Sequence, residues 1–137
     1  MDATGKNKKA IEVVALALQR STDQKYLITR RGPGQSGAGE WEFPGGKVEP
    51  GETQTQALVR EIDEELSIEL IEKRLLLLGD HVEHYPQKSV HIFLWKMTID
   101  SDPAITLTEH DQFQWISKEQ IHVLSLSAGD QAFIALL

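Results

Sequence analysis

The apolar residues of the chain fall into short blocks, and the first of these blocks predict β-strands. Ile11–Gln19 starts with β-branched residues and is almost continuously apolar, which is typical of a central strand covered on both faces. Lys25–Arg31 follows a polar turn, so the two segments are predicted to form a hairpin. Trp41–Phe43 is expected to be a short extended piece that ends at Pro44.

Further blocks predict three more strands and three helices. The strands are Leu75–His84, Ser89–Ile99 and Phe113–Ile116. The helices are Thr53–Leu66, a short one that starts at Ser117 with Gln120 as its capping-box partner, and an amphipathic one at Ala128–Leu137. Strands that alternate with helices in this way indicate a mixed sheet with helices packed on it. We therefore expect an α+β fold, an αβα sandwich.

The length and composition fit one globular domain. The 137 residues suit a single domain over residues 1–137, of which residues 1–9 are expected to form a flexible tail. The chain has no cysteine, so neither a disulfide nor a thiolate metal site is available. No apolar run has the length of a signal peptide or a membrane span, and we therefore expect a cytoplasmic protein.

The charge of the chain limits its partners. It carries 14 Lys and Arg against 21 Asp and Glu, for a formal charge of -7. Binding to a nucleic-acid polymer or to an anionic membrane needs a basic surface. We therefore expect neither partner, and a monomer that acts on a small molecule. An anionic small molecule would need a positive element between it and this chain.

One predicted helix gathers three carboxylates. At about 100° per residue, Glu61, Glu64 and Glu65 fall within one arc of the helix, with the small Ala57 expected to leave space beside them. The adjacent apolar arc must face the sheet; it consists of Leu58, Val59, Ile62 and Leu66. Carboxylates gathered without Cys or His provide the hard oxygen ligands of Mg²⁺ or Mn²⁺. The helix pattern alone fits a solvated acidic face equally well.

The spacing of this segment resembles the Nudix box. Gly46 is followed after five residues by Glu52, after seven more by Arg60-Glu61, and then by Ile62, one residue, Glu64-Glu65, one residue, Ser67 and Ile68. The family motif has Gly where this chain has Ser67. That Gly ends the helix in a left-handed conformation, so Ser67 is expected to cost about 1 kcal/mol and no metal ligand.

The resemblance implies a fold, a reaction and a metal site. Nudix proteins are αβα sandwiches that contain the box as a loop, helix and loop, and they hydrolyse nucleoside diphosphates linked to another group with a divalent metal. The resemblance implies that Glu61, Glu64 and Glu65 bind Mg²⁺, or Mn²⁺ in its place, together with the Gly45 carbonyl. It also implies that Arg60 orients the acids by pairing with them or with Glu52.

Other segments resemble the MutT branch of that family. The matching residues are Ile28–Arg31, Trp41–Glu49 and His91–Trp95. MutT-type enzymes convert 8-oxo-dGTP to 8-oxo-dGMP and pyrophosphate, which implies nucleotide-pool sanitisation that suppresses mutation during DNA replication and contributes to DNA repair. The resemblance also makes Glu109, six residues before Trp115, a metal-site acid and candidate base, although Glu109 alone would be an ordinary loop acid.

The same resemblance implies a set of substrate contacts: Arg31, Glu42, Phe43, Pro44, Gly45, Lys47 and Asp130. Three of them have alternative roles. Arg31 suits a phosphate or a base carbonyl but also the surface of a strand. Phe43 could line a base pocket or fill the core. Lys47 could contact phosphate or only pair with Glu49.

Two positions depart from the MutT pattern. Asp130 stands where MutT has an Asn, and Ser36 stands where MutT has a His, in a loop 32–39 that we expect to be mobile. An ionised Asp only accepts hydrogen bonds, which suits the N1 and N2 edge of guanine and also N4 of cytosine. Alternatively, Asp130 caps the last helix.

These departures leave three hypotheses for the function. The first is a MutT-like hydrolase of 8-oxo-dGTP. The second is a Nudix enzyme for another substrate, such as CTP, 5-methyl-dCTP, a dinucleoside polyphosphate or an RNA 5′ end. The third is a Nudix-fold binding module without catalysis, which the presence of all the box acids disfavours.

Overall fold

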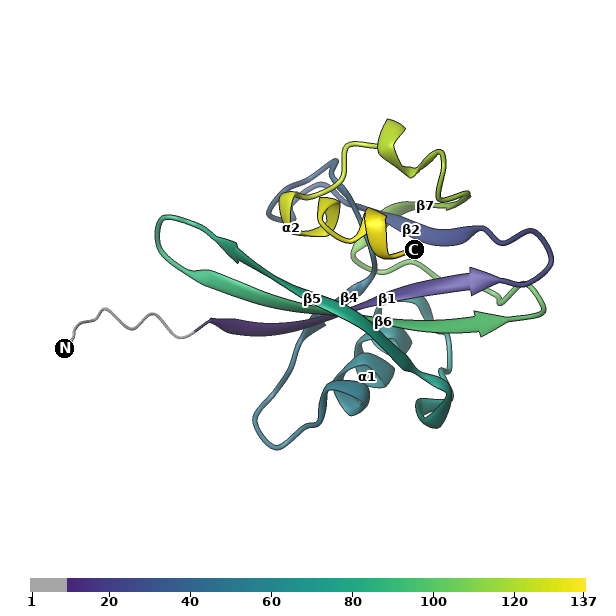
Figure 1. Ribbon diagram of the computed structural model, residues 1–137, viewed down its shortest axis with the longest axis horizontal. Helices are drawn as coiled ribbons and strands as arrows, with labels where there is room; N and C mark the ends of the chain where they lie inside the picture. Colours follow the sequence, from purple (N-terminus) through teal and green to yellow (C-terminus); the bar gives the residue numbers. More distant parts are fainter. Residues whose placement is uncertain (1–9) are drawn as a thin grey trace.

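The computed structural model describes residues 10–137, and its central feature is a mixed seven-stranded sheet (Figure 1). The strands are β1 (Ile11–Arg20), β2 (Tyr26–Arg31), β3 (Trp41–Glu42), β4 (Gly45–Lys47), β5 (Leu76–His84), β6 (Ser89–Ile99) and β7 (His110–Ile116). The main path runs β3-β2-β1-β6-β5, while β4 pairs with β1 and β7 pairs with β2. Among the paired strands of residues 10–137, only β1 and β6 run parallel to each other. The predicted tail at residues 1–9 lies outside the described residues.

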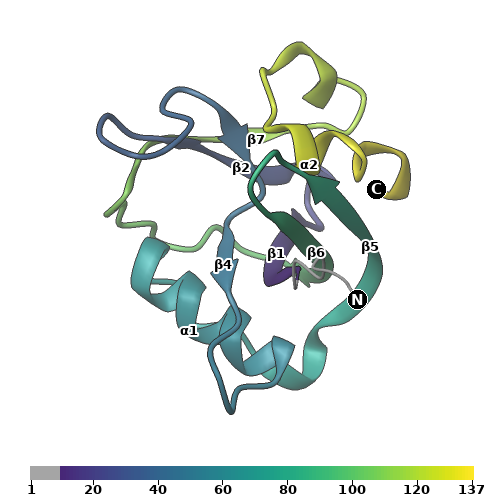
Figure 2. The ribbon, with the colours of Figure 1, turned by 90° about the vertical axis from the view of Figure 1, so that its left-hand side faces the viewer.

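The central strand β1 is covered on both faces, as its continuous apolar run predicts. Residues on alternate positions of β1 enter different cores. Val14, Leu16 and Leu18 pack against α1 (Gln54–Leu66), whereas Ala15 and Ala17 belong to the core beneath the C-terminal segment. Figures 1 and 2 show α1 on one side of the sheet and the C-terminal segment on the other. The expected αβα sandwich is therefore confirmed.

Helix α1 starts one residue after the predicted Thr53 and ends at the predicted Leu66, and both of its ends are capped. The Thr53 side chain accepts a hydrogen bond from Gln56 N, and the Gln56 side chain accepts one from Thr53 N, which completes a capping box. Ser67 ends the helix at φ 58°, and its N–H donates to the Asp63 carbonyl at 3.0 Å. One expectation is wrong: Ala57 leaves no space beside the acids, because it is fully buried in the core.

Two helix predictions near the C-terminus are wrong. The segment that starts at Ser117 forms a turn, in which Gln120 N donates to the Ser117 carbonyl at 2.9 Å, and then the short 3-10 helix η2 (Ile121–Val123). The predicted helix Ala128–Leu137 is divided into α2 (Ala128–Gln131) and a 3-10 turn, η3 (Ile134–Leu136). Ten residues are too few for a helix that is stable alone, so tertiary packing decides their conformation.

Packing around Phe133 accounts for that division. The Phe133 ring is 1% exposed and lies edge-on to Phe43 and to His81, at centroid distances of 6.5 and 6.4 Å. The chain between α2 and η3 brings this ring into the core beneath the sheet. No helix within residues 10–137 is long and apolar enough to cross a membrane.

Strand β4 is a feature that the sequence analysis missed. Gly45 and Gly46 have low strand propensity, yet they pair antiparallel with Ala15 and Val14 of β1. A Cβ on Gly45 would collide with the Val14 carbonyl oxygen and lie 2.8 Å from Ala15 Cα. Glycine is therefore required for the close approach of β4 to β1, and this approach places the start of the box beside α1 (Figure 2).

Replacing Ser67 tests the cost of its left-handed conformation. We expect Ser67→Gly to raise the free energy of unfolding by about 0.5–1 kcal/mol, because glycine adopts positive φ without a Cβ clash. Ser67→Ala keeps the Cβ and should give no such gain. Urea unfolding of the three proteins measures the difference, and equal stability of the Gly and Ala variants would contradict this explanation.

Candidate active site

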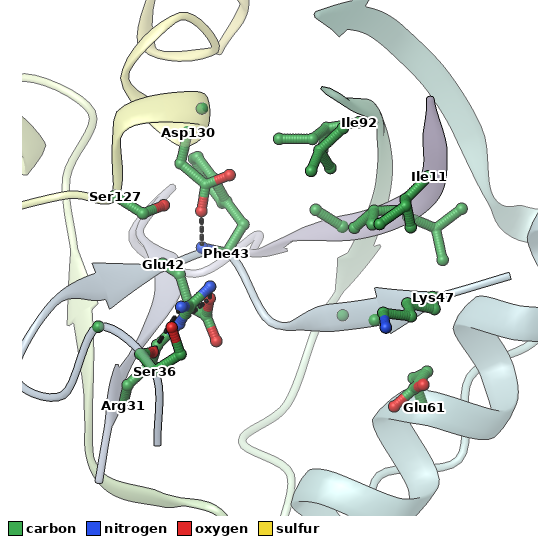
Figure 3. Close-up of a pocket in the computed structure, with 18 of the residues that line it drawn as sticks. Ile11, Arg31, Ser36, Glu42, Phe43, Lys47, Glu61, Ile92, Ser127 and Asp130 are labelled. Carbon is green, nitrogen blue, oxygen red and sulfur yellow. Dashed lines mark hydrogen bonds and ion pairs between the residues drawn. The ribbon is translucent and has the colours of Figure 1, made fainter. Parts of the chain in front are cut away.

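One large cavity brings together most of the residues that the sequence analysis identified. Its volume is about 1220 Å³, and its walls come from β1, β4, α1, the loop after β2, the turn between β5 and β6, and α2. Figure 3 shows Glu61 and Lys47 in one part of this space and Asp130 with Phe43 in another. The cavity therefore has an acidic end at α1 and a second end at α2.

The acidic end contains all four carboxylates that the sequence analysis assigned to a metal. Glu61, Glu64 and Glu65 reach it from α1, and Glu109 reaches it from the loop before β7. Their exposure differs, since Glu65 is 7% exposed while the Glu64 side chain is 60% exposed. The helical spacing thus delivers one buried and one open carboxylate to the same wall.

Arg60 holds this acidic end in place. Its Nε and Nη2 donate to the two carboxylate oxygens of Glu52 at 2.7 and 2.9 Å, which is the bidentate geometry of a strong pair. Its Nη1 reaches Glu61 at 3.2 Å and Glu64 at 3.4 Å. The hydrogen bonds between the two side chains lower the pKa of Glu52 to about 2 and raise the pKa of Arg60 above its ordinary value. The predicted pairing of Arg60 with Glu52 and the acids is confirmed.

Glu65 is a buried carboxyl that lies among other acids. Burial, followed by the nearby Glu61, Glu42 and Glu109, raises the pKa of Glu65 to about 9. Its Oε1 is buried and has no hydrogen-bond partner within the described residues. A cation beside Glu65 would give this oxygen a partner and would favour the ionised form. The carboxyl therefore fits a divalent-metal ligand.

The surroundings of Glu61 fit the same role. A Cβ on Gly46 would collide with the Glu61 carboxylate, so glycine at this position leaves the space that the acid occupies. Within residues 10–137, however, no three His, Asp or Glu side chains converge on one point as in a formed metal site. The acids supply oxygen ligands of the right kind, and Arg60 pairs with two of them in this arrangement.

The expected substrate contacts do not all reach the cavity. Arg31, Glu42, Phe43, Gly45, Lys47 and Asp130 line it. Pro44 is absent from its lining, and the Pro44 carbonyl instead accepts a hydrogen bond from Leu16 N at 2.8 Å. Phe43 combines its two alternatives, since it is 2% exposed in the core and also forms part of the wall. No ion pair joins Lys47 to Glu49 among the described residues.

Asp130 links α2 to the strand segment that contains Phe43. Asp130 is 5% exposed, and its Oδ2 accepts a hydrogen bond from Phe43 N at 3.0 Å (Figure 3). The suggestion that Asp130 caps the last helix is wrong, because Ser127 is the N-cap residue and Asp130 lies inside α2. Burial, followed by the charge of Glu42, raises the pKa of Asp130 to about 7.

Some residues that line the cavity were not identified by the sequence analysis, among them His110 and Tyr85. His110 enters the wall because β7 starts at His110, three residues before the predicted strand. Tyr85 enters it from the turn between β5 and β6. Neither residue has a spacing signal of its own. An accurate register between β2 and β7, which pairs Arg31 with His110, would have identified the histidine.

Comparisons with known proteins relate the chain to one family and to named relatives. A model of the NUDIX domain matches residues 8–137. The chain is 38% identical over 132 residues to a protein of Escherichia coli named CTP pyrophosphohydrolase, covering 93% of this chain and 94% of that protein. It is 40% identical over 89 residues to the 8-oxo-dGTP diphosphatase of Haemophilus influenzae, covering 65% of this chain and 63% of that protein.

A solved structure also resembles this fold over nearly its whole length. The solution structure of the E. coli ORF135 protein superposes with a TM-score of 0.79 at 35% sequence identity, and the match covers 94% of this chain and 89% of that chain. The family model, which matches residues 8–137, includes the residues at both ends of the cavity.

Replacing Glu65 tests the buried carboxyl in the metal-free protein. The folded-state pKa of about 9 lies above the ordinary value of 4.5, so the native state keeps a proton that the unfolded chain loses. Stability should therefore fall as the pH rises from about 5 towards 9. We expect Glu65→Gln to remove most of this fall and to raise the unfolding temperature at pH 8.

Thermal unfolding with a chelator, at several pH values, measures this effect. Glu64→Gln is the matched control on the same helix, and its exposed side chain should leave the pH dependence unchanged. A wild-type stability that is flat between pH 5 and pH 8 would contradict a neutral, buried Glu65.

Proposed function

The chain belongs to the NUDIX family of hydrolases that act on nucleotides, and on that premise we propose that it is a pyrophosphohydrolase of nucleoside triphosphates that prefers 8-oxo-dGTP. Nudix hydrolases generally use divalent metals, and we propose Mg²⁺ here, with Mn²⁺ able to replace it. The observation that carries the proposal is a single cavity with the Arg60-bound acids at one end and the buried Asp130 at the other.

The acidic end suits hydrolysis of a phosphorus anhydride. Glu61, Glu64 and Glu65, with the Gly45 carbonyl, would hold the divalent ion, which when bound neutralises phosphate charge and lowers the pKa of a coordinated water. Arg60 holds Glu61 and Glu64 by ion pairs at the end of the cavity where the ion would bind. Glu109 reaches the same end from a loop and is the candidate to accept the proton of the attacking water.

The remaining charges of this end fit a triphosphate. Lys47 lines the cavity next to the box, in the same part of Figure 3 as Glu61, and its ammonium is available to phosphate oxygens. The acids alone would repel a triphosphate, so the bound cation is the positive element that the charge of -7 requires. Removal of the cation should then impair binding of the nucleotide as well as its hydrolysis.

Asp130 suits recognition of the base at the other end. A carboxyl with a pKa of about 7 is present in both forms near neutrality, and the protonated form can donate as well as accept. It therefore offers the donor and acceptor that the Asn of MutT enzymes would offer to oxidised guanine. The hydrogen bond from Phe43 N–H holds the Asp130 carboxyl in position.

A second candidate substrate is CTP or 5-methyl-dCTP. The ionised form of Asp130 is an acceptor suited to N4 of cytosine. The relative named CTP pyrophosphohydrolase also covers 93% of this chain, more than the 8-oxo-dGTP diphosphatase of Haemophilus influenzae does. The site would thus carry out the same hydrolysis on a different base. A dinucleoside polyphosphate or an RNA 5′ end has no comparable support at Asp130.

A product screen tests the reaction and its substrate. With Mg²⁺ we expect 8-oxo-dGTP to give its monophosphate and pyrophosphate, with a kcat/KM well above that for dGTP, and no turnover with a chelator. Glu65→Gln should abolish turnover, because a neutral amide replaces the buried carboxylate ligand. Asp63→Asn, on the exposed side of the same helix, is the control and should retain activity.

The outcomes of this screen separate the hypotheses. Equal turnover of dGTP and 8-oxo-dGTP would argue against the sanitising role, and preferred turnover of CTP would select the second candidate. Binding without turnover of any nucleotide would leave only the binding module.

Replacing Asp130 tests base recognition. Asp130→Asn keeps an acceptor for Phe43 N–H and turns the second oxygen into a donor, which suits the carbonyls of 8-oxoguanine better than the N4 amine of cytosine. We expect the ratio of kcat/KM for 8-oxo-dGTP over CTP to rise roughly tenfold. Steady-state kinetics of both substrates measure the ratio. An unchanged ratio would mean that Asp130 acts only in the fold.

A further inference from the structure

His110 is a buried histidine with one clear partner. It is the first residue of β7, and its side chain is 4% exposed. Its Nε2 lies 2.8 Å from Oε2 of Glu42, so Nε2 must carry the proton that a carboxylate accepts. Its Nδ1 is buried and has no partner within the described residues. A buried nitrogen without a partner is uncommon in folded proteins and costs stability. A histidine kept at this cost suggests that its other contact, with Glu42, has a role beyond stability.

The contact continues through Glu42 to Arg31. The other carboxylate oxygen of Glu42, Oε1, accepts from Nε of Arg31 at 2.8 Å and lies 2.8 Å from Nη2. Nη1 of Arg31 then donates to the Ser36 carbonyl at 2.7 Å, in the loop that follows β2. Four residues thus form one hydrogen-bonded chain: His110, Glu42, Arg31 and Ser36. Figure 3 shows Arg31, Glu42 and Ser36 clustered below Phe43 and Asp130.

All four residues of this hydrogen-bonded series face the same cavity. Each of the four residues lines it, together with Asp130 and Glu109. The charge of Asp130 reaches Arg31: burial lowers the pKa of Arg31, while Glu42, then Glu40 and then Asp130 raise it above its ordinary value. The position of the Arg31 guanidinium therefore bears directly on the end of the cavity where Asp130 lies.

Backbone pairing between β2 and β7 holds His110 where it can reach Glu42. Arg31 and His110 are register partners, and the ladder between β2 and β7 is irregular between Arg30 and Arg31. At the same point Gly32 N donates to the Glu109 carbonyl at 3.1 Å, and a Cβ on Gly32 would lie 2.8 Å from that oxygen. Gly32 therefore lies against the backbone of Glu109, the residue before His110, at an irregular point of the ladder where a larger residue than glycine would clash.

We propose that His110 is a positioning residue for nucleotide binding, which holds Glu42 so that Glu42 holds Arg31 at the base end of the cavity. The proposal rests on the proposed function, because it assigns a role within that substrate site. Without the imidazole, one oxygen of the half-buried Glu42 loses its donor, and the carboxylate can turn away from Arg31. The effect should fall on substrate binding more than on the chemical step at the acidic end.

Two amide variants separate this role from simple packing. In His110→Gln the amide nitrogen can occupy the place of Nε2, whereas in His110→Asn it corresponds to Nδ1 and falls short of Glu42. We expect His110→Ala and His110→Asn to raise KM for the preferred nucleotide on the order of tenfold with kcat changed much less, and His110→Gln to restore KM. His91→Gln is the control, because His91 pairs with Asp80 outside the cavity lining.

The same kinetics show what would overturn the proposal. Equal KM values for the Gln and Asn variants, or a loss confined to kcat or to the unfolding temperature, would assign His110 to another role. If the wild-type protein hydrolyses no nucleotide, the proposed function fails. The dissociation constants of 8-oxo-dGTP and CTP with Mg²⁺ are then measured by calorimetry for the wild type and the three His110 variants. If the Ala and Asn variants do not bind more weakly than the Gln variant, the positioning role is also rejected.

Discussion

Repulsion among carboxylates at one end of a cavity is the constraint on which the rest of this structure depends. Arg60 neutralises part of it by binding Glu52 in a bidentate pair and reaching Glu61 and Glu64. Glu65 avoids it by keeping its proton, since burial favours the neutral acid. Some repulsion remains, and the divalent cation that we propose at this end would reduce it further. Bound there, the cation would also offset the repulsion between these acids and a phosphorylated ligand.

The fold meets this constraint by bringing β4 close to β1 and α1. Gly45 and Gly46 remove the side chains that would prevent this approach, and the space beside Gly46 is filled by the Glu61 carboxylate. The apolar face of α1 then packs on alternate residues of β1, while the other residues of β1 face the C-terminal segment. One central strand thus fixes the distance between the acidic wall and the wall that contains Asp130.

The end of the cavity at α2 is organised by polar contacts between segments that are far apart in sequence. Asp130 accepts from Phe43 N across 87 positions, and His110 meets Glu42 across 68. Both contacts are made by the adjacent residues Glu42, which ends β3, and Phe43, which lies just before β4, where the box starts.

The sequence by itself determined the elements and residues that follow from local spacing. The period of α1, its capping box, the left-handed Ser67 and the acids on one helical face depend only on residues a few positions apart. Tertiary structure alone decided the conformation of β4, the division of Ala128–Leu137 and the contacts of Asp130 and His110. Their energies come from partners brought together by the folded sheet, and short segments without such partners have no preferred structure of their own.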